Sequence, residues 1–278
     1  MRLSDYLVLV RGGGDLGTGV AHRLVRSGFT VMVTELAQPL AVRRTVSFAE
    51  AVYAGQITVE GVTARLANDP MLGMAFTAVG EVPVIVDLAD DVIDRMRPAV
   101  VVDARLAKRN LSTRREDAPL VIGLGPGFTA GEDCHAVVET NRGHNLGRVY
   151  WEGGAEADTG LPEPVLGQAG QRVLRAPADG LFQGHTAIGQ AAQPGDVLAS
   201  VEGAAIVAPF AGVVRGLLHD GVPVTAGMKV GDLDPRGMPE LCFLISDKAR
   251  AIGGGVLEAM MGGMDLWGKA EDLIDEGE

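Results

Sequence analysis

A gapless internal repeat is the feature that most constrains this chain of 278 residues. Residues 176–201 align with residues 208–233 at a constant offset of 32 positions, and six positions are identical, four of them glycine and one proline. Glycine and proline fix the backbone more than other residues do, so the two copies should share one backbone shape. Each copy predicts a short strand, a glycine turn and a final strand.

The two copies resemble the hammerhead halves of biotinyl/lipoyl-type carrier domains, and we therefore expect a barrel-sandwich hybrid at 175–235. A carrier domain presents a lysine on the hairpin between its halves. The connection here, residues 201–209, has no lysine, and Lys229 lies in the last turn region instead. We therefore expect no biotin or lipoate, and a rigid acidic module that docks a partner or covers the first domain.

The first 150 residues alternate β-rich runs with helical patterns, which is typical of βαβ units and a mainly parallel sheet. The predicted fold class is α/β, with a Rossmann-like parallel-sheet domain, a linker rich in Gly, Pro and acid, the barrel-sandwich hybrid and C-terminal helices. The predicted boundaries are 1–150, 151–174, 175–235 and 236–278. Strands are expected at 6–10, 30–34, 83–86, 98–102 and 120–124, and helices at 17–26, 47–54, 69–78, 89–95, 248–261 and 266–274.

A glycine-rich loop follows the first predicted strand and opens a predicted helix. Its G-x-G-x-x-G spacing would allow a tight turn, approach of the backbone to a pyrophosphate, and close packing of helix on strand. Glu35 ends the second predicted strand, where it could accept hydrogen bonds from a ribose and favour NAD over NADP. Packing alone is the competing explanation of the glycines. The candidate cofactor-binding residues of the loop are Gly12, Gly13, Gly14, Asp15, Leu16 and Gly17.

Asp15 is unexpected in a phosphate-binding loop. Its carboxylate must turn away, cap the helix or hold a metal. A cluster of basic residues follows the strand that ends near Val102, and Arg105, Lys108 and Arg109 are its candidate ligand residues. A solvated charged surface is the alternative. Because parallel sheets present ligands at the carboxyl ends of their strands, the cluster favours a small anionic cofactor or a phosphate tail.

A second glycine-dense loop, residues 123–131, is expected to form either a tight crossover or a ligand loop, with Gly125 and Gly127 as candidate cofactor contacts. Cys134 follows it and is the candidate catalytic residue, as a thiolate that carries or receives sulfur. A buried small hydrophobe is the commoner role of cysteine. Cys134 and His135 are neighbours and would point to opposite faces of a strand, so we expect no metal site.

The formal net charge is −12. Residues 1–150 carry a net charge of −1 and residues 151–278 carry −11. The acidity opposes nucleic-acid binding, and its position leaves the first half able to receive an anion. Two cysteines, no apolar run long enough for a membrane span and no signal-peptide pattern lead us to expect a soluble cytoplasmic protein without a membrane partner. Homo-oligomerisation stays open.

Three segments resemble the YqeB-type family of accessory proteins for selenium-dependent molybdenum hydroxylases: residues 11–19 (RGGGDLGTG), residues 102–110 (VDARLAKRN), and residues 123–135 continuing to 139–149. The resemblance implies a relation to XdhC-like maturation factors, whose Rossmann domain helps to prepare the molybdenum cofactor before its insertion. The implied partners are a molybdenum hydroxylase or cofactor-maturation proteins. No catalytic residue is carried over from the family.

The function expected from this resemblance is maturation of a molybdenum hydroxylase, with a nucleotide or molybdopterin (di)nucleotide bound on residues 1–150. An anionic pterin phosphate suits a glycine loop and an Arg/Lys cluster. One alternative is an NAD-dependent oxidoreductase, which Glu35 favours but which lacks an evident proton-relay residue. Another is a non-catalytic nucleotide-sensing interaction module. Whether the protein catalyses a reaction stays open.

Overall fold

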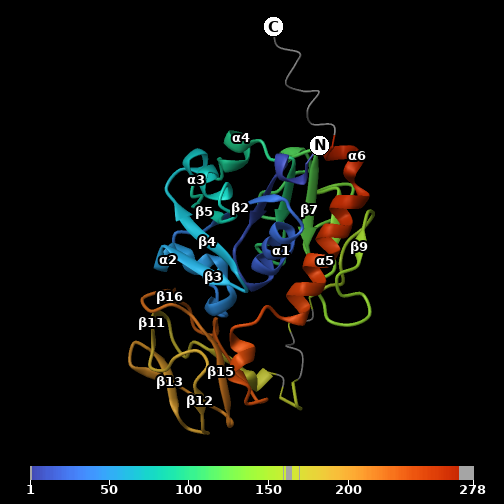
Figure 1. Ribbon diagram of the computed structural model, residues 1–278. Coiled ribbons are helices and arrows are strands. Elements are labelled where there is room, and N and C mark those ends of the chain that lie inside the picture. The colour runs from blue at the N-terminus through green and yellow to red at the C-terminus, as the bar shows by residue number, and fades with distance from the viewer. Residues whose placement is uncertain (1, 159, 161–164, 169, 269–278) are drawn as a thin grey trace.

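The computed structural model describes residues 2–158, 160, 165–168 and 170–268 (Figure 1). Its larger domain is built on a nine-stranded sheet with the order β3-β4-β5-β2-β1-β6-β7-β8-β9. The seven inner strands are parallel, and the edge strands β3 and β9 are antiparallel to their neighbours. The strands are β1 (Leu7–Arg11), β2 (Thr30–Glu35), β3 (Gln56–Val59), β4 (Val62–Ala67), β5 (Val82–Val86), β6 (Val100–Asp103), β7 (Leu120–Leu124), β8 (Ala136–Val138) and β9 (Val149–Tyr150).

The central strands are continuous runs of Val, Ile and Leu because helices cover both faces of the sheet. Alternate residues of β1 divide between the two faces: Val8 and Val10 pack in the core with α1 and α5, and Leu9 packs in the core beside α3 and α4. The helices are α1 (Asp15–Arg26), α2 (Ala51–Ala54), α3 (Pro70–Thr77), α4 (Val92–Met96), α5 (Asp247–Gly262) and α6 (Met264–Trp267).

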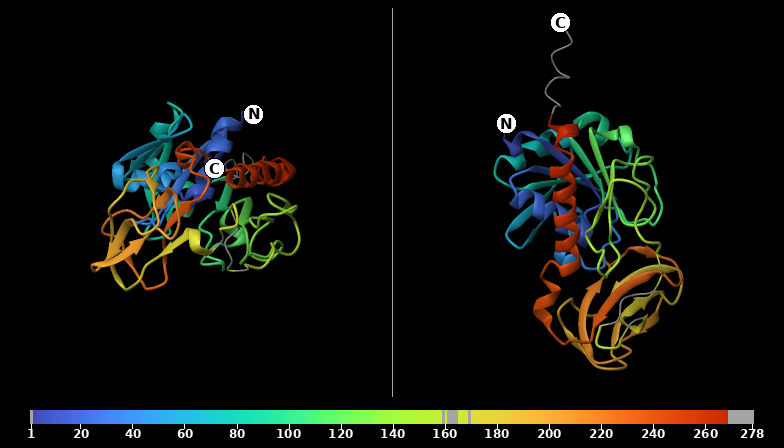
Figure 2. Two further views of the ribbon diagram at one scale, coloured as in Figure 1. Left: turned by 90° about the horizontal axis from the view of Figure 1, so that it is seen from below. Right: turned by 90° about the vertical axis from the view of Figure 1, so that its right-hand side faces the viewer.

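Helix α5 returns from the end of the chain to lie beside α1 on this sheet (Figures 1 and 2). Small residues allow the close approach, since a Cβ on Gly19 of α1 would lie 2.7 Å from Cβ of Ala249. Trp267 closes the same core, where its ring meets that of Tyr6 edge-on at 4.9 Å. The C-terminal helices are therefore part of the first domain.

The smaller domain consists of two four-stranded sheets, β10-β17-β15-β12 and β14-β13-β11-β16. Their strand pairs are antiparallel. The 32-residue offset of the repeat relates β11, β12 and β13 to β15, β16 and β17. The strands are β10 (Val173–Arg175), β11 (Gly180–Gly184), β12 (Ala191–Ala192), β13 (Val197–Val201), β14 (Ala204–Val207), β15 (Gly212–Leu217), β16 (Pro223–Val224) and β17 (Lys229–Asp234).

The predicted fold class needs correction. The prediction of a Rossmann-like parallel sheet, a barrel-sandwich hybrid and C-terminal helices is wrong. The large sheet is mixed, the second domain consists of two antiparallel sheets, and α5 completes the core of the first domain. Prediction of the large sheet missed the β3–β4 hairpin and the strands β8 and β9. Part of the helix expected at 266–274 lies outside the described residues, and α6 is a single turn that shares only residues 266 and 267 with it.

Candidate functional site

The loop between β1 and α1 forms a tight, glycine-dependent turn. Gly12 has φ +97°, and a Cβ on Gly17 would lie 2.0 Å from the carbonyl oxygen of Gly12, so Gly17 allows the helix to pack on the strand. Gly14 is the N-cap of α1 and differs from both, because a Cβ there would meet nothing within 4 Å. Within the described residues, no side chain caps α1. The N-terminus of α1 therefore borders open space at Gly14.

A cavity of about 540 Å³ lies at this loop, along the carboxyl edge of β1, β2 and β6. The predicted cofactor-binding residues that line it are Gly12, Gly14, Asp15, Leu16, Gly17, Glu35 and Arg105. Leucine side chains line another part of the cavity, and three of them are exposed: Leu36, Leu40 and Leu111. Residues that the sequence analysis did not single out also line it: Arg11, Thr34, Leu36, Leu40, Asp87, Asp90, Leu106 and Leu111.

Glu35 is held by the loop that it faces. Its Oε2 accepts a hydrogen bond from the backbone N–H of Gly13 at 2.8 Å, and its Oε1 accepts one from Leu36 at 2.8 Å. Burial raises the pKa of this carboxyl, and the two backbone hydrogen bonds act in the opposite direction. Each carboxylate oxygen can accept a second hydrogen bond, so Glu35 can still accept from a ligand hydroxyl.

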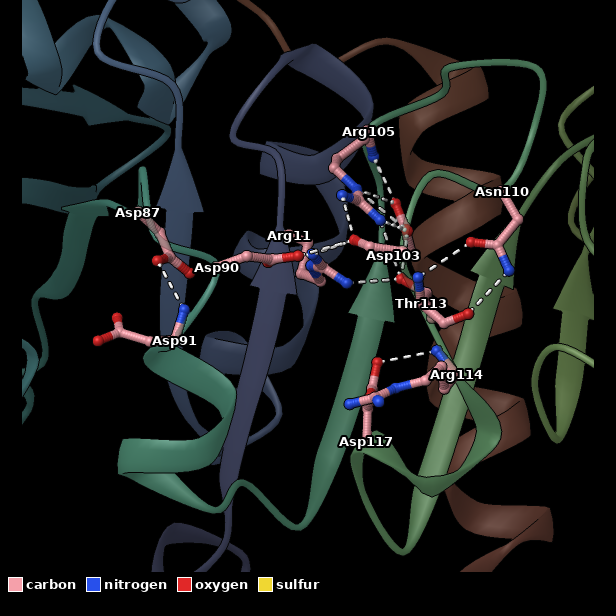
Figure 3. Close-up of polar contacts among 11 residues, drawn as sticks. Arg11, Asp87, Asp90, Asp91, Asp103, Arg105, Asn110, Thr113, Arg114 and Asp117 are labelled. Atoms are coloured by element: carbon pink, nitrogen blue, oxygen red, sulfur yellow. Dashed lines mark hydrogen bonds and ion pairs between the residues drawn. The ribbon is translucent and has the colours of Figure 1, made fainter.

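Arg11 and Arg105 belong to one polar network at the end of β1 and β6 (Figure 3). Arg105 pairs with Asp103 through its Nη2 at 2.6 Å and its Nε at 3.1 Å. Thr113 accepts from Arg11 at 2.7 Å and donates to Asp103 at 2.6 Å. Arg11 is buried and also pairs with Asp90. Both guanidinium groups are thus already compensated, and the network fixes the floor of the cavity.

The rest of the predicted basic cluster lies elsewhere. Lys108 pairs with Asp158 at 3.2 Å and lines a different cavity, between the two domains. Arg109 is exposed and lines neither cavity. Adjacency in sequence therefore does not bring these cations together around one ligand.

The second glycine loop is used for packing. A Cβ on Gly125 would lie 2.3 Å from Oγ1 of Thr140, and one on Gly127 would lie 2.6 Å from Cα of Arg109. Neither glycine lines either cavity. These contacts fit a tight crossover of the backbone.

Cys134 is buried, and its thiol donates to the carbonyl oxygen of Ala136 at 3.3 Å. Burial raises the pKa of this thiol to about 12, with Asp133 adding to the effect. The thiol is therefore protonated near neutral pH and is a poor nucleophile in this conformation. The adjacent His135 is a structural residue, since its Nδ1 accepts from the backbone of Val121 at 3.0 Å.

Asp15 lines the cavity, and its carboxylate pairs with Arg43 at 3.3 Å. Across the described ranges, no group of three or more His, Cys, Asp or Glu side chains is placed to hold a metal ion. The same part of the chain contains no helix that is long and apolar enough to cross a membrane. The ion pair with Arg43 was not among the three roles expected for this carboxylate.

The sequence comparisons give a relative without an assigned activity. No family model matches the chain. The chain is 52% identical over 255 residues, 92% of its length, to the uncharacterized protein YqeB of Escherichia coli (strain K12). The match covers 47% of that protein, so the chain spans about half the length of the curated relative it matches. The likeness to YqeB agrees with the resemblance drawn from the motifs, whereas no comparison supports a relation to XdhC-like factors or to selenium.

Two solved structures align with the chain at low scores. An aspartoacylase family protein from Mesorhizobium loti aligns at a TM-score of 0.26 and 13% identity, and a succinylglutamate desuccinylase/aspartoacylase from Rhodobacter sphaeroides aligns at 0.26 and 15%. Each alignment covers 82% of this chain and 84% of the other. Such low scores carry no argument for a hydrolase here.

The function expected from the sequence needs correction, because no comparison supports it. No family model matches, and the relative YqeB is named only as uncharacterized. The maturation role, with its molybdenum and selenium partners, is therefore withdrawn. The NAD-dependent oxidoreductase and the nucleotide-sensing interaction module find no support in the comparisons either.

Proposed function

We propose that the cavity beside α1 binds a ribonucleotide. The observation that carries the proposal is the N-terminus of α1, which has no side-chain cap and lies next to open space at Gly14 on the wall of the cavity. The N–H groups of a first helical turn and the helix dipole together favour a phosphate. A ligand phosphate would satisfy donors that the described side chains leave without a cap.

The remaining walls suit a nucleoside. Glu35 would accept hydrogen bonds from ribose hydroxyls with the lone pairs that Gly13 and Leu36 do not use. Leu36 and Leu40 line the cavity and are 54% and 45% exposed, so a base packed against them would bury apolar surface. The glycine loop, the acid and the apolar wall thus line one cavity, where they would contact the phosphate, the ribose and the base.

The charges of the cavity restrict the ligand further. Four carboxylates line it, and its two guanidinium groups already pair with Asp90 and Asp103. A nucleoside triphosphate would therefore meet more repulsion than a ligand with one pyrophosphate shared between two groups. We expect a dinucleotide-type ligand: NAD and a pterin dinucleotide both fit this description, and no reaction is assigned to either. Glu35 would also repel a ribose 2′-phosphate.

Calorimetry with NAD, NADP, ADP and ATP tests the proposal. We expect NAD to bind more tightly than NADP, and ADP more tightly than ATP. Gly14→Ala should weaken binding about tenfold or more, because a methyl group in the open space would push a phosphate off charge-assisted hydrogen bonds. Gly254→Ala is the matched control, since a Cβ there also meets nothing within 4 Å but lies on α5, away from the cavity.

Two results would contradict the proposal. One is that none of the four ligands binds to the unmodified chain. The other is that Gly14→Ala and Gly254→Ala bind the ligand as tightly as each other.

A further inference from the structure

A second cavity, of about 430 Å³, lies between the two domains. Eight Lys or Arg side chains line it against four Asp or Glu, although the chain as a whole carries a net charge of −12. Its positive lining is therefore a local concentration of charge against the trend of the protein. It shares only Asp15 and Leu16 with the cavity proposed for the nucleotide.

The smaller domain supplies half of these cations. Arg172 and Arg175 come from η5 (Gly170–Arg172) and β10, Arg215 from β15 and Lys229 from β17. Residues 151–278 contain only eight Lys and Arg in all against nineteen acids. Five of the eight line this single cavity, the fifth being Lys248. An even scatter of cations over the acidic half would not produce this arrangement.

The larger domain supplies the other half, from loops far apart in the sequence. Arg43 follows β2, Lys108 follows β6, Arg142 follows β8, and Lys248 lies in the first turn of α5. The chain has four lysines, and all three that the structure describes line this cavity. A ligand bound here would contact both domains.

Carboxylates pair with five of the eight cations: Arg43 with Asp15, Lys108 with Asp158, Arg142 with Asp247, Arg172 with Asp232 and Arg215 with Asp234. Arg43 is buried, with Asp15 at 3.3 Å, and Arg215 is nearly buried, with Asp234 at 3.6 Å. The Nε of each guanidinium has no hydrogen-bond partner among the described residues. Burial and the nearby Arg43 lower the pKa of Arg215, which reports two like charges held close together. An anion between the domains would relieve this repulsion.

We propose that the cavity between the domains binds a small polyanion that carries phosphate groups. Guanidinium groups bind phosphate oxygens in a bidentate manner, and five arginines with three lysines match several phosphate charges better than one carboxylate. The cavity has few apolar side chains, so charge rather than hydrophobic burial would select the ligand. The proposal does not depend on the nucleotide proposed for the other cavity.

The small number of lysines allows a direct test by differential acetylation of the full chain, followed by mass spectrometry. Inorganic pyrophosphate and triphosphate are the probes, and citrate is the polycarboxylate comparison. At ten times the dissociation constant, we expect acetylation of Lys108, Lys229 and Lys248 to slow by about tenfold. Lys269, which lies outside the described residues, is the internal reference and should react unchanged. Protection by citrate alone, or equal protection of all four lysines, would overturn the proposal.

Two variants locate the binding by calorimetry. Lys229 is exposed and makes no ion pair within the described ranges, so Lys229→Gln should fold normally and bind pyrophosphate about tenfold more weakly. Arg148→Gln is the control, because Arg148 is exposed and lines neither cavity. Pyrophosphate binding that Lys229→Gln keeps and Gly14→Ala abolishes would place the anion on α1 and refute this inference alone.

Discussion

Three consecutive glycines in α5 provide a test of how this helix packs. A Cβ on Gly254 would meet nothing within 4 Å, whereas one on Gly255 would lie 2.2 Å from the carbonyl oxygen of Gly147. Gly253 is intermediate, since its Cβ would lie 2.8 Å from the carbonyl oxygen of Gly19 on α1. The same substitution to alanine should therefore have opposite signs at neighbouring positions.

The magnitudes follow from two effects. Alanine in place of glycine within a helix stabilises by about 0.5–1 kcal/mol, which is the whole expected effect of Gly254→Ala. At Gly255 the helix must also move by about 1 Å to clear a backbone oxygen, and overpacking of this kind costs about 1–3 kcal/mol. We expect a net loss of stability of about 1–2 kcal/mol for Gly255→Ala.

Tryptophan fluorescence during urea unfolding measures these changes. Both tryptophans, Trp151 and Trp267, contact elements of the first domain, and residues 173–234 contain none, so the signal reports the domain to which α5 belongs. Gly254→Ala should raise the midpoint and Gly255→Ala should lower it. Equal midpoints for the two variants would refute the packing of α5 on the loop at Gly147.

Other predictions concern thiols, pH and the domain contact. Cys134 and Cys242 are both buried with raised thiol pKa values, so Ellman's reagent should react with neither in the native protein and with both in denaturant; fast native reaction would contradict this. Arg142 lowers the pKa of Asp247, so Asp247→Asn should be less stable than the unmodified chain at pH 7. This difference in stability should disappear as the pH falls below 3.8, and a difference independent of pH would exclude the pairing. A Cβ on Gly216 would lie 2.7 Å from a backbone oxygen of the first domain. Gly216→Ala should therefore separate the unfolding transitions of the two domains in calorimetry. An unchanged single transition would count against that contact.

The sequence predicts the central strands well because their pattern is local. Parallel strands covered on both faces are continuous apolar runs, and the strand expected at 120–124 is β7 with the same bounds. The hairpin of β3 and β4 was missed because its two-residue turn, Glu60-Gly61, lacks the usual Asn-Gly or Asp-Gly pair. Both turn residues nevertheless have positive φ, 44° and 81°, and the flanking alternation was the available signal.

The candidate site could be predicted only as far as one loop and one strand end. Gly12 and Gly14 belong to the turn itself, Glu35 ends the next strand, and all three line one cavity. The basic cluster illustrates the limit, because Arg105 turns back onto Asp103 while Lys108 faces the other domain. The cavity between the domains depends on contacts across the whole chain, which no local spacing encodes.

Asp15 links the two cavities, and this position yields a last prediction. It is the first residue of α1, it lines both cavities, and its carboxylate pairs with Arg43. Asp15→Asn removes a negative charge beside both proposed phosphate positions. It should therefore tighten binding of NAD and of pyrophosphate, each by about threefold to tenfold at low salt.

The effect should shrink as salt is added, because the interaction is electrostatic and screened by ions. Tighter binding of pyrophosphate alone would limit the influence of Asp15 to the cavity that Arg43 lines. Weaker binding of both ligands would mean that the carboxylate is needed to orient Arg43 and that its charge is not the dominant effect. If the carboxylate of Asp15 lowers the affinity of both cavities for their anions, its place in a loop otherwise suited to phosphate would limit how tightly either anion binds.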